Sequence, residues 1–265
     1  MKITVLLENT LRDECLTAEH GLSLYLETEK HRILFDMGQT DAFAQNAQQL
    51  GINLQDVDIA VLSHGHYDHG GGISRFLELN KKAPVYLSAH AFGPHYHGED
   101  KYIGLDTALH GSGRLRFVEE DCILDDTLSL HACSGAACVE PIESYGLTVH
   151  TPRGFEPETF RHEQYLLIRE KGKKILISGC SHRGILNIVR WFEPDVLIGG
   201  FHLMKLDPAV EAHKKTLSRL ADELLRGHTQ YYTGHCTGAP AYAFLKERMG
   251  DRLDELYTGL SVHAA

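Results

Sequence analysis

The chain has 265 residues and a formal net charge of -10, and its 43% hydrophobic and 23% charged residues are typical of a globular protein. The acidic balance disfavours nonspecific binding to nucleic acid, which depends on lysine and arginine side chains that neutralise phosphates. No apolar run approaches the roughly 18 to 20 residues of a membrane span, and the N-terminal segment becomes acidic too early for a secretory signal, so we expect a cytoplasmic protein with no membrane partner.

The first part of the chain predicts a hairpin, a helix and a strand in succession. Residues 22 to 36 consist of two apolar runs around a polar turn, which is typical of a β-hairpin. The amphipathic pattern of residues 41 to 50 ends at Gly51 and predicts a helix. Residues 57 to 63 predict a buried strand that leads directly into His64, and a further helix is expected over residues 73 to 80.

Four potential metal ligands lie within six residues after that strand, in the segment HGHYDH. His64 and His66 are two residues apart, so in an extended segment their side chains lie on one side and can bind one metal ion. Asp68 and His69 fall on the turn into the next helix, where they can bind a second ion. A solvent-exposed polar turn is the alternative, which the buried strand disfavours because buried polar clusters are costly unless they are paired.

Residues 91 to about 160 interrupt the regular pattern. They contain many Gly, His, Cys and Pro residues and only short apolar runs, at 115–118, 128–130 and 147–150. Long irregular stretches in a compact domain are often functional. We therefore expect loops and short strands that form an inserted cap over the site.

Residues 165 to 201 repeat the pattern of the first part. In both hairpins seven residues separate the last apolar residue of the first run from the first of the second, from Leu26 to Ile33 and from Ile168 to Ile175. A helix over residues 184 to 192 and a strand over 195 to 201 follow, and this strand leads into His202. Such a repeat predicts two sheets packed face to face with helices on the outer faces; chance likeness of two generic segments is the alternative.

The C-terminal part predicts two helices and a strand. A helix is expected from Pro208 to Arg226, with Asp207 as its N-cap. Residues 230 to 233 predict a strand that ends at Gly234-His235-Cys236, and residues 239 to 249 predict the last helix.

Several side chains with metal-binding or acid–base chemistry follow these later strands. Cys180 is interpreted as a ligand, with a buried structural thiol as the alternative. His235 is interpreted as a ligand, and His202 as a substrate contact or proton donor. Cys236 and Thr237 either offer backbone N–H groups to an anion or form a tight turn.

The segment His64–His69 resembles the His-X-His-X-Asp-His signature of the metallo-β-lactamase superfamily. Leu34–Gly38, Ile177–Cys180 and Tyr232–His235 are similar to further motifs of that superfamily. The resemblance covers nearly the whole chain and implies a single domain over residues 1–265 with an α/β fold, a four-layer αββα sandwich of two similar halves.

Other phrases narrow the resemblance to one branch of the superfamily. That branch includes 7,8-dihydropterin-6-methyl-4-(β-D-ribofuranosyl)aminobenzene 5'-phosphate synthase and related metallo-hydrolases. The phrases that carry the resemblance, besides the histidine-rich segment, are Lys101–Gly104, Ser178–Ile185, Gly199–Leu203 and Gly234–Gly238.

The resemblance implies a binuclear site with two divalent metal ions, zinc being expected first and manganese or iron as alternatives. The ligands it implies are His64, His66, Asp68, His69, Cys180, His182 and His235. Asp36 would support the site without binding metal. The usual histidine of the third motif has no clear counterpart here; His150, His162 and His182 are candidates, and we favour His182.

The implied function is hydrolysis of a phosphoester or similar small anionic substrate through a metal-bound hydroxide. Asp68 would orient the water, and His202 or His182 would protonate the leaving group. A transferase resembling the synthase, which releases pyrophosphate, is the first alternative, and a metal-dependent sensor or binding module with weak catalysis is the second. The sequence specifies neither the substrate nor the oligomeric state.

Overall fold

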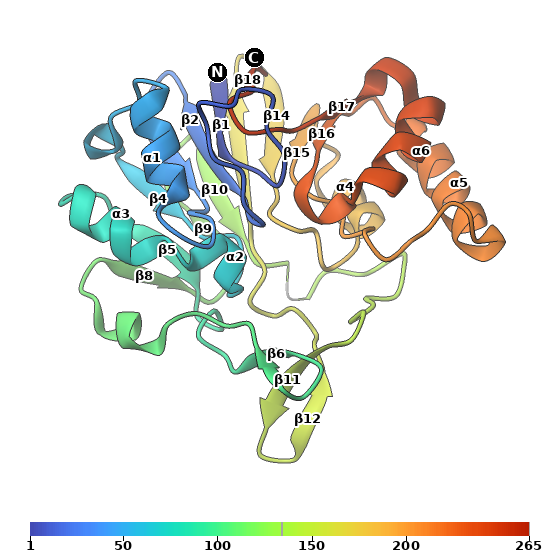
Figure 1. Cartoon of the computed structure of the whole chain (residues 1–265), viewed down its shortest axis with the longest axis horizontal. Coiled ribbons are helices and arrows are strands. Elements are labelled where there is room, and N and C mark those ends of the chain that lie inside the picture. The colour runs from blue at the N-terminus through green and yellow to red at the C-terminus, as the bar shows by residue number, and fades with distance from the viewer. Residues whose placement is uncertain (134, 265) are drawn as a thin grey trace.

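Two seven-stranded mixed sheets form the centre of the structure, a computed structural model that describes residues 1–133 and 135–264 (Figure 1). The first sheet contains, in spatial order, β18 (Ser261–His263), β1 (Lys2–Leu7), β2 (Ser23–Glu27), β3 (Arg32–Phe35), β4 (Ile59–Val61), β5 (Val85–Ser88) and β8 (Leu115–Val118). The second sheet contains β9 (Cys122–Ile123), β10 (Leu128–His131), β13 (Tyr165–Glu170), β14 (Lys173–Ile177), β15 (Val196–Ile198), β16 (Gln230–Thr233) and β17 (Leu253–Glu255).

The two sheets have the same pairing pattern. In the order given, each begins with three antiparallel pairs and continues with three parallel pairs. The predicted hairpins are β2–β3, in which Leu26 pairs with Ile33, and β13–β14, in which Ile168 pairs with Ile175. The internal repeat predicted from the sequence is therefore confirmed.

Alternating side chains along the strands build the layers, because successive residues of a strand point to opposite faces. Phe35 and Ile177 are buried between the two sheets, whereas their neighbours Leu34 and Leu176 are buried against helices. Helices α1 (Ala42–Gln49) and α3 (Ile73–Leu79) cover the first sheet, and α4 (Ile185–Phe192), α5 (Glu211–Leu225) and α6 (Ala239–Met249) cover the second. The predicted four-layer αββα sandwich is confirmed.

One predicted helix start is wrong. Helix α5 begins at Glu211 with Val210 as its N-cap, three residues after the predicted start at Pro208. The side chain of Asp207 instead accepts a hydrogen bond from the backbone N–H of Ala209 at 2.8 Å. Aspartate commonly bonds the backbone two residues ahead in this way, which favours a turn over the start of a helix.

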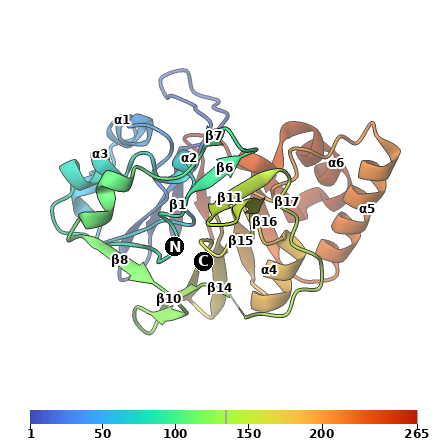
Figure 2. The same ribbon diagram turned by 90° about the horizontal axis from the view of Figure 1, so that it is seen from below.

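The stretch predicted as one cap divides into two parts. Strands β8, β9 and β10 extend the two main sheets, whereas a separate four-stranded sheet is made of β12 (Gly154–Pro157), β11 (Leu147–Thr151), β6 (His95–His97) and β7 (Lys101–Tyr102). This second part, which we call the cap sheet, lies below the main sheets in Figure 1, and Figure 2 shows β6 and β11 between the two halves. The short apolar runs were predicted as strands, but their sheet partners could not be read from them.

The described residues also contain four short 3-10 helices: η1 (Leu54–Asp56), η2 (Thr107–Gly111), η3 (His235–Thr237) and η4 (Gly250–Arg252). A short helix α2 (Tyr67–Gly70) continues the histidine-rich segment. Among the described residues, no helix has the length and apolar character needed to cross a membrane.

Packing between the sheets is expected to dominate stability. Ile177 is completely buried there, whereas Ile123 is 81% exposed on β9. Replacing Ile177 with Ala should lower the free energy of unfolding by about 2–5 kcal/mol, because lost transfer energy and a residual cavity add together. Ile123→Ala should change it by less than about 0.5 kcal/mol. Urea unfolding of both variants measures the difference, and equal effects would contradict this account of the core.

Candidate metal centre

Imidazoles, a carboxylate and a thiol converge where the parallel strands of the two sheets end. His64 follows β4, Cys180 follows β14, His202 follows β15 and His235 follows β16. In open α/β sheets, ligands bind outside the carboxyl ends of parallel strands, where loops can place polar groups. The structure therefore brings potential metal ligands from both halves of the sandwich together at one edge.

Strained backbone accompanies these strand ends. Asp36, Ser181, His202 and His235 have positive φ angles of 57°, 56°, 54° and 46°. Left-handed conformations are costly for residues with a side chain, and they persist where the surrounding structure enforces them, often at functional sites. Here they lie one to four residues after the end of a strand, where they reverse the chain and turn polar side chains toward the shared edge.

Three imidazoles form the first group of candidate ligands. The ligand atoms of His64, His66 and His182 lie within 4.8 Å of one another, and the two Nε2 atoms of His64 and His182 are 3.3 Å apart. All three side chains are buried. Among residues 1–133 and 135–264, His66 Nε2 and His182 Nδ1 have no hydrogen-bond partner. Buried polar atoms are rarely left unpaired, so the unpartnered Nε2 of His66 fits a bound cation, whereas His182 faces His64 through its Nε2.

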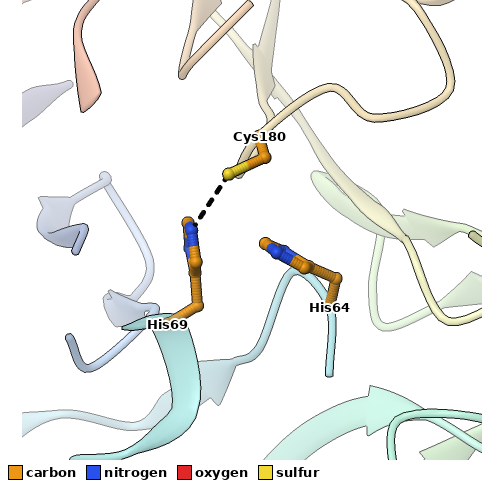
Figure 3. Close-up of side chains that lie close together, drawn as sticks. All are labelled: His64, His69 and Cys180. Atoms are coloured by element: carbon orange, nitrogen blue, oxygen red, sulfur yellow. Dashed lines mark hydrogen bonds between the residues drawn. The ribbon is translucent and has the colours of Figure 1, made fainter. Parts of the chain in front are cut away.

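A second group surrounds His69. Its Nε2 lies 3.1 Å from Cys180 Sγ and 3.1 Å from His235 Nε2, and Figure 3 shows the rings of His64 and His69 beside the Cys180 sulfur. The carboxylate of Asp68 lies 3.3 Å from His235 Nε2. Such close packing of nitrogen, sulfur and oxygen donors matches the ligand chemistry of zinc.

Buried hydrogen bonds fix the orientation of these rings. Asp36 Oδ2 is 2.6 Å from His69 Nδ1, which leaves Nε2 of that ring facing the site. Ser63 Oγ is 2.8 Å from His64 Nδ1, and Asn9 Oδ1 is 2.8 Å from His235 Nδ1. Metal-binding histidines ordinarily use the second ring nitrogen in this way, which holds the ligand atom in place.

Burial and neighbouring charges shift the pKa values of these groups. Burial lowers the pKa of His66 to about 3 and lowers the pKa of His64 and His182 well below the usual value. Neutral imidazoles keep the lone pair that a metal ion needs. Burial alone would lower the pKa of His235, but the hydrogen bond to Asp68 and other nearby negative charges raise it to about 9.

Asp68 stays ionised in this setting. Burial alone would raise the pKa of its carboxyl, but the charge of His69 and hydrogen bonds from His20 and His235 lower it well below its usual value. An ionised carboxylate is both a ligand for a dication and an acceptor for water. Its placement among imidazoles therefore supplies the negative charge that a cation site requires.

The structure brings together every side chain that the sequence predicted for the site: His64, His66, Asp68, His69, Cys180, His182, His202 and His235. Their roles remain predictions. Of the other candidates for the third motif, His150 is exposed on β11 and packs against Phe155. His162 is buried, and its Nδ1 accepts the backbone N–H of Gly65 at 2.9 Å.

A cavity of about 270 Å³ opens onto these groups. Several side chains that line it or lie beside it were not predicted from the sequence. His20 comes from the loop between β1 and β2, with its Nε2 3.3 Å from Asp68 Oδ2. His97 and Lys101 reach the cavity from the cap sheet, and Tyr145 and Lys205 from loops. Of these residues, only Lys101 lies in a segment that the sequence analysis had singled out. The others could not be assigned to the site, because loop residues follow no periodic pattern from which their position can be predicted.

A buried pair supports the cap sheet beside the cavity. His95 Nδ1 lies 2.6 Å from Glu158 Oε2, and both side chains are buried. Burial alone would raise the pKa of Glu158, but the hydrogen bond and charge of His95 and two backbone N–H groups lower it. The ionised carboxylate therefore stabilises the link between β6 and the segment after β12.

The pair of His95 and Glu158 should make the free energy of unfolding depend on pH. Glu158→Gln should lower the free energy of unfolding at pH 7 by roughly 1.5–3 kcal/mol, as expected for a charged hydrogen bond. Because folding lowers the pKa of Glu158, its contribution is complete above the unfolded value of 4.5 and disappears as pH falls through the folded value. Urea unfolding at several pH values should show the gap closing in acid.

Glu156→Gln provides the control, because Glu156 lies on β12 and pairs only with the exposed Arg153 among its ion pairs in the described residues. Its loss should be small at every pH. A gap for Glu158→Gln that stays constant from pH 7 into acid would contradict the assignment.

Comparison with known proteins agrees with this architecture. A sequence profile of the family described as "Metallo-beta-lactamase superfamily" matches residues 16–137. An uncharacterized protein of Methanocaldococcus jannaschii is 29% identical over 92% of this chain and 94% of its own length. From the same organism, 7,8-dihydropterin-6-methyl-4-(beta-D-ribofuranosyl)-aminobenzene-5'-phosphate synthase is 26% identical over 91% of this chain and 89% of its own length.

A solved structure extends the likeness to three dimensions. The crystal structure of Tm1679, described as a metal-dependent hydrolase of the beta-lactamase superfamily, matches 100% of this chain and 99% of that chain with a TM-score of 0.82 and 29% identity. In sequence over residues 16–137 and in fold over its whole length, this chain is therefore similar to the metallo-β-lactamase superfamily. It is also similar to the branch that includes the dihydropterin–aminobenzene phosphate synthase.

Proposed function

We propose that this protein is a binuclear metal-dependent hydrolase that cleaves a phosphoester or similar small anionic substrate. The observation that carries the proposal is the meeting of two groups of buried donor atoms at one cavity. The unpartnered His66 nitrogen and the close His64 and His182 nitrogens in the first group, and the mixed nitrogen, sulfur and oxygen donors in the second, fit two divalent ions. Zinc suits this donor set best, with manganese or iron as alternatives.

The donors divide naturally between the two ions. His64, His66 and His182 would hold the first ion, which makes His182 the substitute for the missing third-motif histidine. The second ion would be held by Asp68, His69, Cys180 and His235. This division is supported by the short distances within each group and by the hydrogen bonds that orient His64, His69 and His235.

Side chains around the ions would handle the protons of hydrolysis. When bound, two dications supply Lewis acidity that lowers the pKa of a nearby water and stabilises negative charge on the substrate. Asp68 would accept a hydrogen bond from the attacking water and take its proton. His202 would give a proton to the leaving oxygen as the bond from phosphorus to that oxygen breaks.

His202 suits this role better than His182. It lines the cavity, its Nδ1 is buried with no partner among the described residues, and its ring lies 4.2 Å from that of His182. His182 is packed against Phe160 in a stacked arrangement, with ring centroids 4.4 Å apart, and faces His64. Lys101 and Lys205 line the same cavity and favour an anionic substrate.

A transferase reaction is the second candidate. The specific observation that favours it is the 26% identity to the dihydropterin–aminobenzene phosphate synthase over most of both chains. In such a reaction the same side chains would bind a diphosphate and help it leave. One assay separates the two functions: product formation with and without an aromatic amine acceptor, followed by detection of pyrophosphate.

Removal of two proposed ligands should abolish the activity. The double variant His66→Ala with Asp68→Ala takes one donor from each metal group, so bound metal and phosphodiesterase or phosphatase turnover should both fall by at least about 10²-fold. Metal analysis and assays with aryl phosphate esters measure this. His228→Ala is the control, because that ring is exposed. Full activity in the double variant would refute the proposal.

The proton-donor role of His202 predicts a dependence on the leaving group. His202→Gln should lower kcat by about 10²–10⁴-fold for alkyl esters, whose leaving oxygen needs a proton, and much less for nitrophenyl esters. KM should change little, because the side chain acts after binding. The same loss for both classes of ester would assign His202 to binding instead.

A further inference from the structure

Cys236 follows His235 in the turn after β16, and the metal centre proposed above gives it no role. The residue is only 3% exposed, and it lines the same cavity as Cys180 and His202. The ligand atoms of Cys180, His235 and Cys236 lie within 4.8 Å of one another. The Cys236 thiol also donates a hydrogen bond to the backbone oxygen of Cys180 at 3.4 Å. Two thiols therefore meet on one side of the site.

The backbone turns both His235 and Cys236 toward that site. In an extended strand, consecutive side chains point to opposite faces, but β16 ends at Thr233 and His235 takes a left-handed φ of 46° at the start of η3. The turn is held on both sides, because Glu8 accepts the backbone N–H of His235 and Thr237 Oγ1 accepts the backbone N–H of Phe201. The strained residue thus places two adjacent donors in one site.

Gly200, in the loop after β15, leaves the space that the sulfur occupies. A Cβ at this position would clash with Cys236 Sγ. The φ angle of Gly200 is not positive, in contrast to that of Gly199. A glycine is therefore needed here because any side chain would overlap the Cys236 sulfur, and not because of the backbone conformation. The space that the thiol occupies thus depends on this residue.

We infer that Cys236 is a second sulfur ligand of the metal centre, at the ion that Cys180 and His235 bind. The inference rests on the proposed function, because it concerns the same centre. Each thiol releases its proton to solvent when its sulfur binds the cation. Two thiolates select thiophilic ions such as zinc or cadmium over manganese or magnesium, so the choice of metal narrows.

Cobalt(II) substitution of the full-length protein tests the inference. The intensity of the thiolate-to-cobalt charge-transfer absorption increases with the number of bound thiolates. Cys236→Ser should lower it by about half while cobalt remains bound, and Cys180→Ser should have a similar effect. Cys15→Ser is the matched control, because that thiol is exposed, and its spectrum should equal that of the parent. Gly200→Ala should also weaken the band, because it displaces the sulfur without removing it.

X-ray absorption fine structure of the zinc-loaded parent protein gives a count that needs no variant. Two sulfurs shared by two ions give an average of about one sulfur per zinc, and Cys180 alone gives about half that. The lower count, or an unchanged cobalt band in Cys236→Ser, would overturn the inference and leave the proposed centre intact. Failure of the parent protein to bind cobalt or zinc would instead overturn the proposed function.

Discussion

The buried carboxylate of Asp36 holds together the two strand ends on which the candidate centre is built. It has no exposed surface, and it accepts hydrogen bonds from the backbone N–H and the hydroxyl of Ser63, both at 2.7 Å, and pairs with His69 Nδ1 at 2.6 Å. A buried polar group is costly unless such partners satisfy its hydrogen-bonding atoms. The two carboxylate oxygens of Asp36 thus connect the end of β3 to the end of β4 and to the histidine-rich segment. The first sheet therefore determines where that segment lies.

The repeat explains why one edge of the sandwich collects so many donors. Each half ends its parallel strands on the same side, so the loops after β4 meet those after β14, β15 and β16. The first half contributes imidazoles and a carboxylate, and the second contributes Cys180, His182 and His235. The two halves share a topology but contribute different types of donor side chain, and neither half contains all of the candidate ligands.

Much of the fold and of the candidate site could be predicted from the sequence, because the periodic spacing of apolar residues reflects which side chains are buried in each strand and helix. The hairpin registers followed from apolar spacing, and the helix over residues 239–249 was predicted with its observed bounds. The ligand-dense segment could be identified because four donors in six residues after a buried strand are difficult to explain otherwise. Cys180, His202 and His235 were found by the same argument, since each follows a buried strand.

The rest depends on contacts between distant segments, which no local pattern encodes. Asn9 and His20 lie in a loop far from the motifs, and only the fold brings them to His235 and Asp68. The start of α5 was misplaced because Asp207 bonds its own turn and not the helix. Residues 91–160 were grouped as one cap because short apolar runs do not reveal which strand they pair with.

The cap sheet has a consequence for how such a protein can diversify. Its four strands pair among themselves and form a sheet separate from the two that carry the donors. It nevertheless contributes His97, Lys101 and Leu147 to the cavity wall. Changes in these strands would alter the shape and charge of the cavity wall without disturbing the hydrogen bonds of the main sheets, so the cavity wall and the arrangement of the donor side chains can evolve independently.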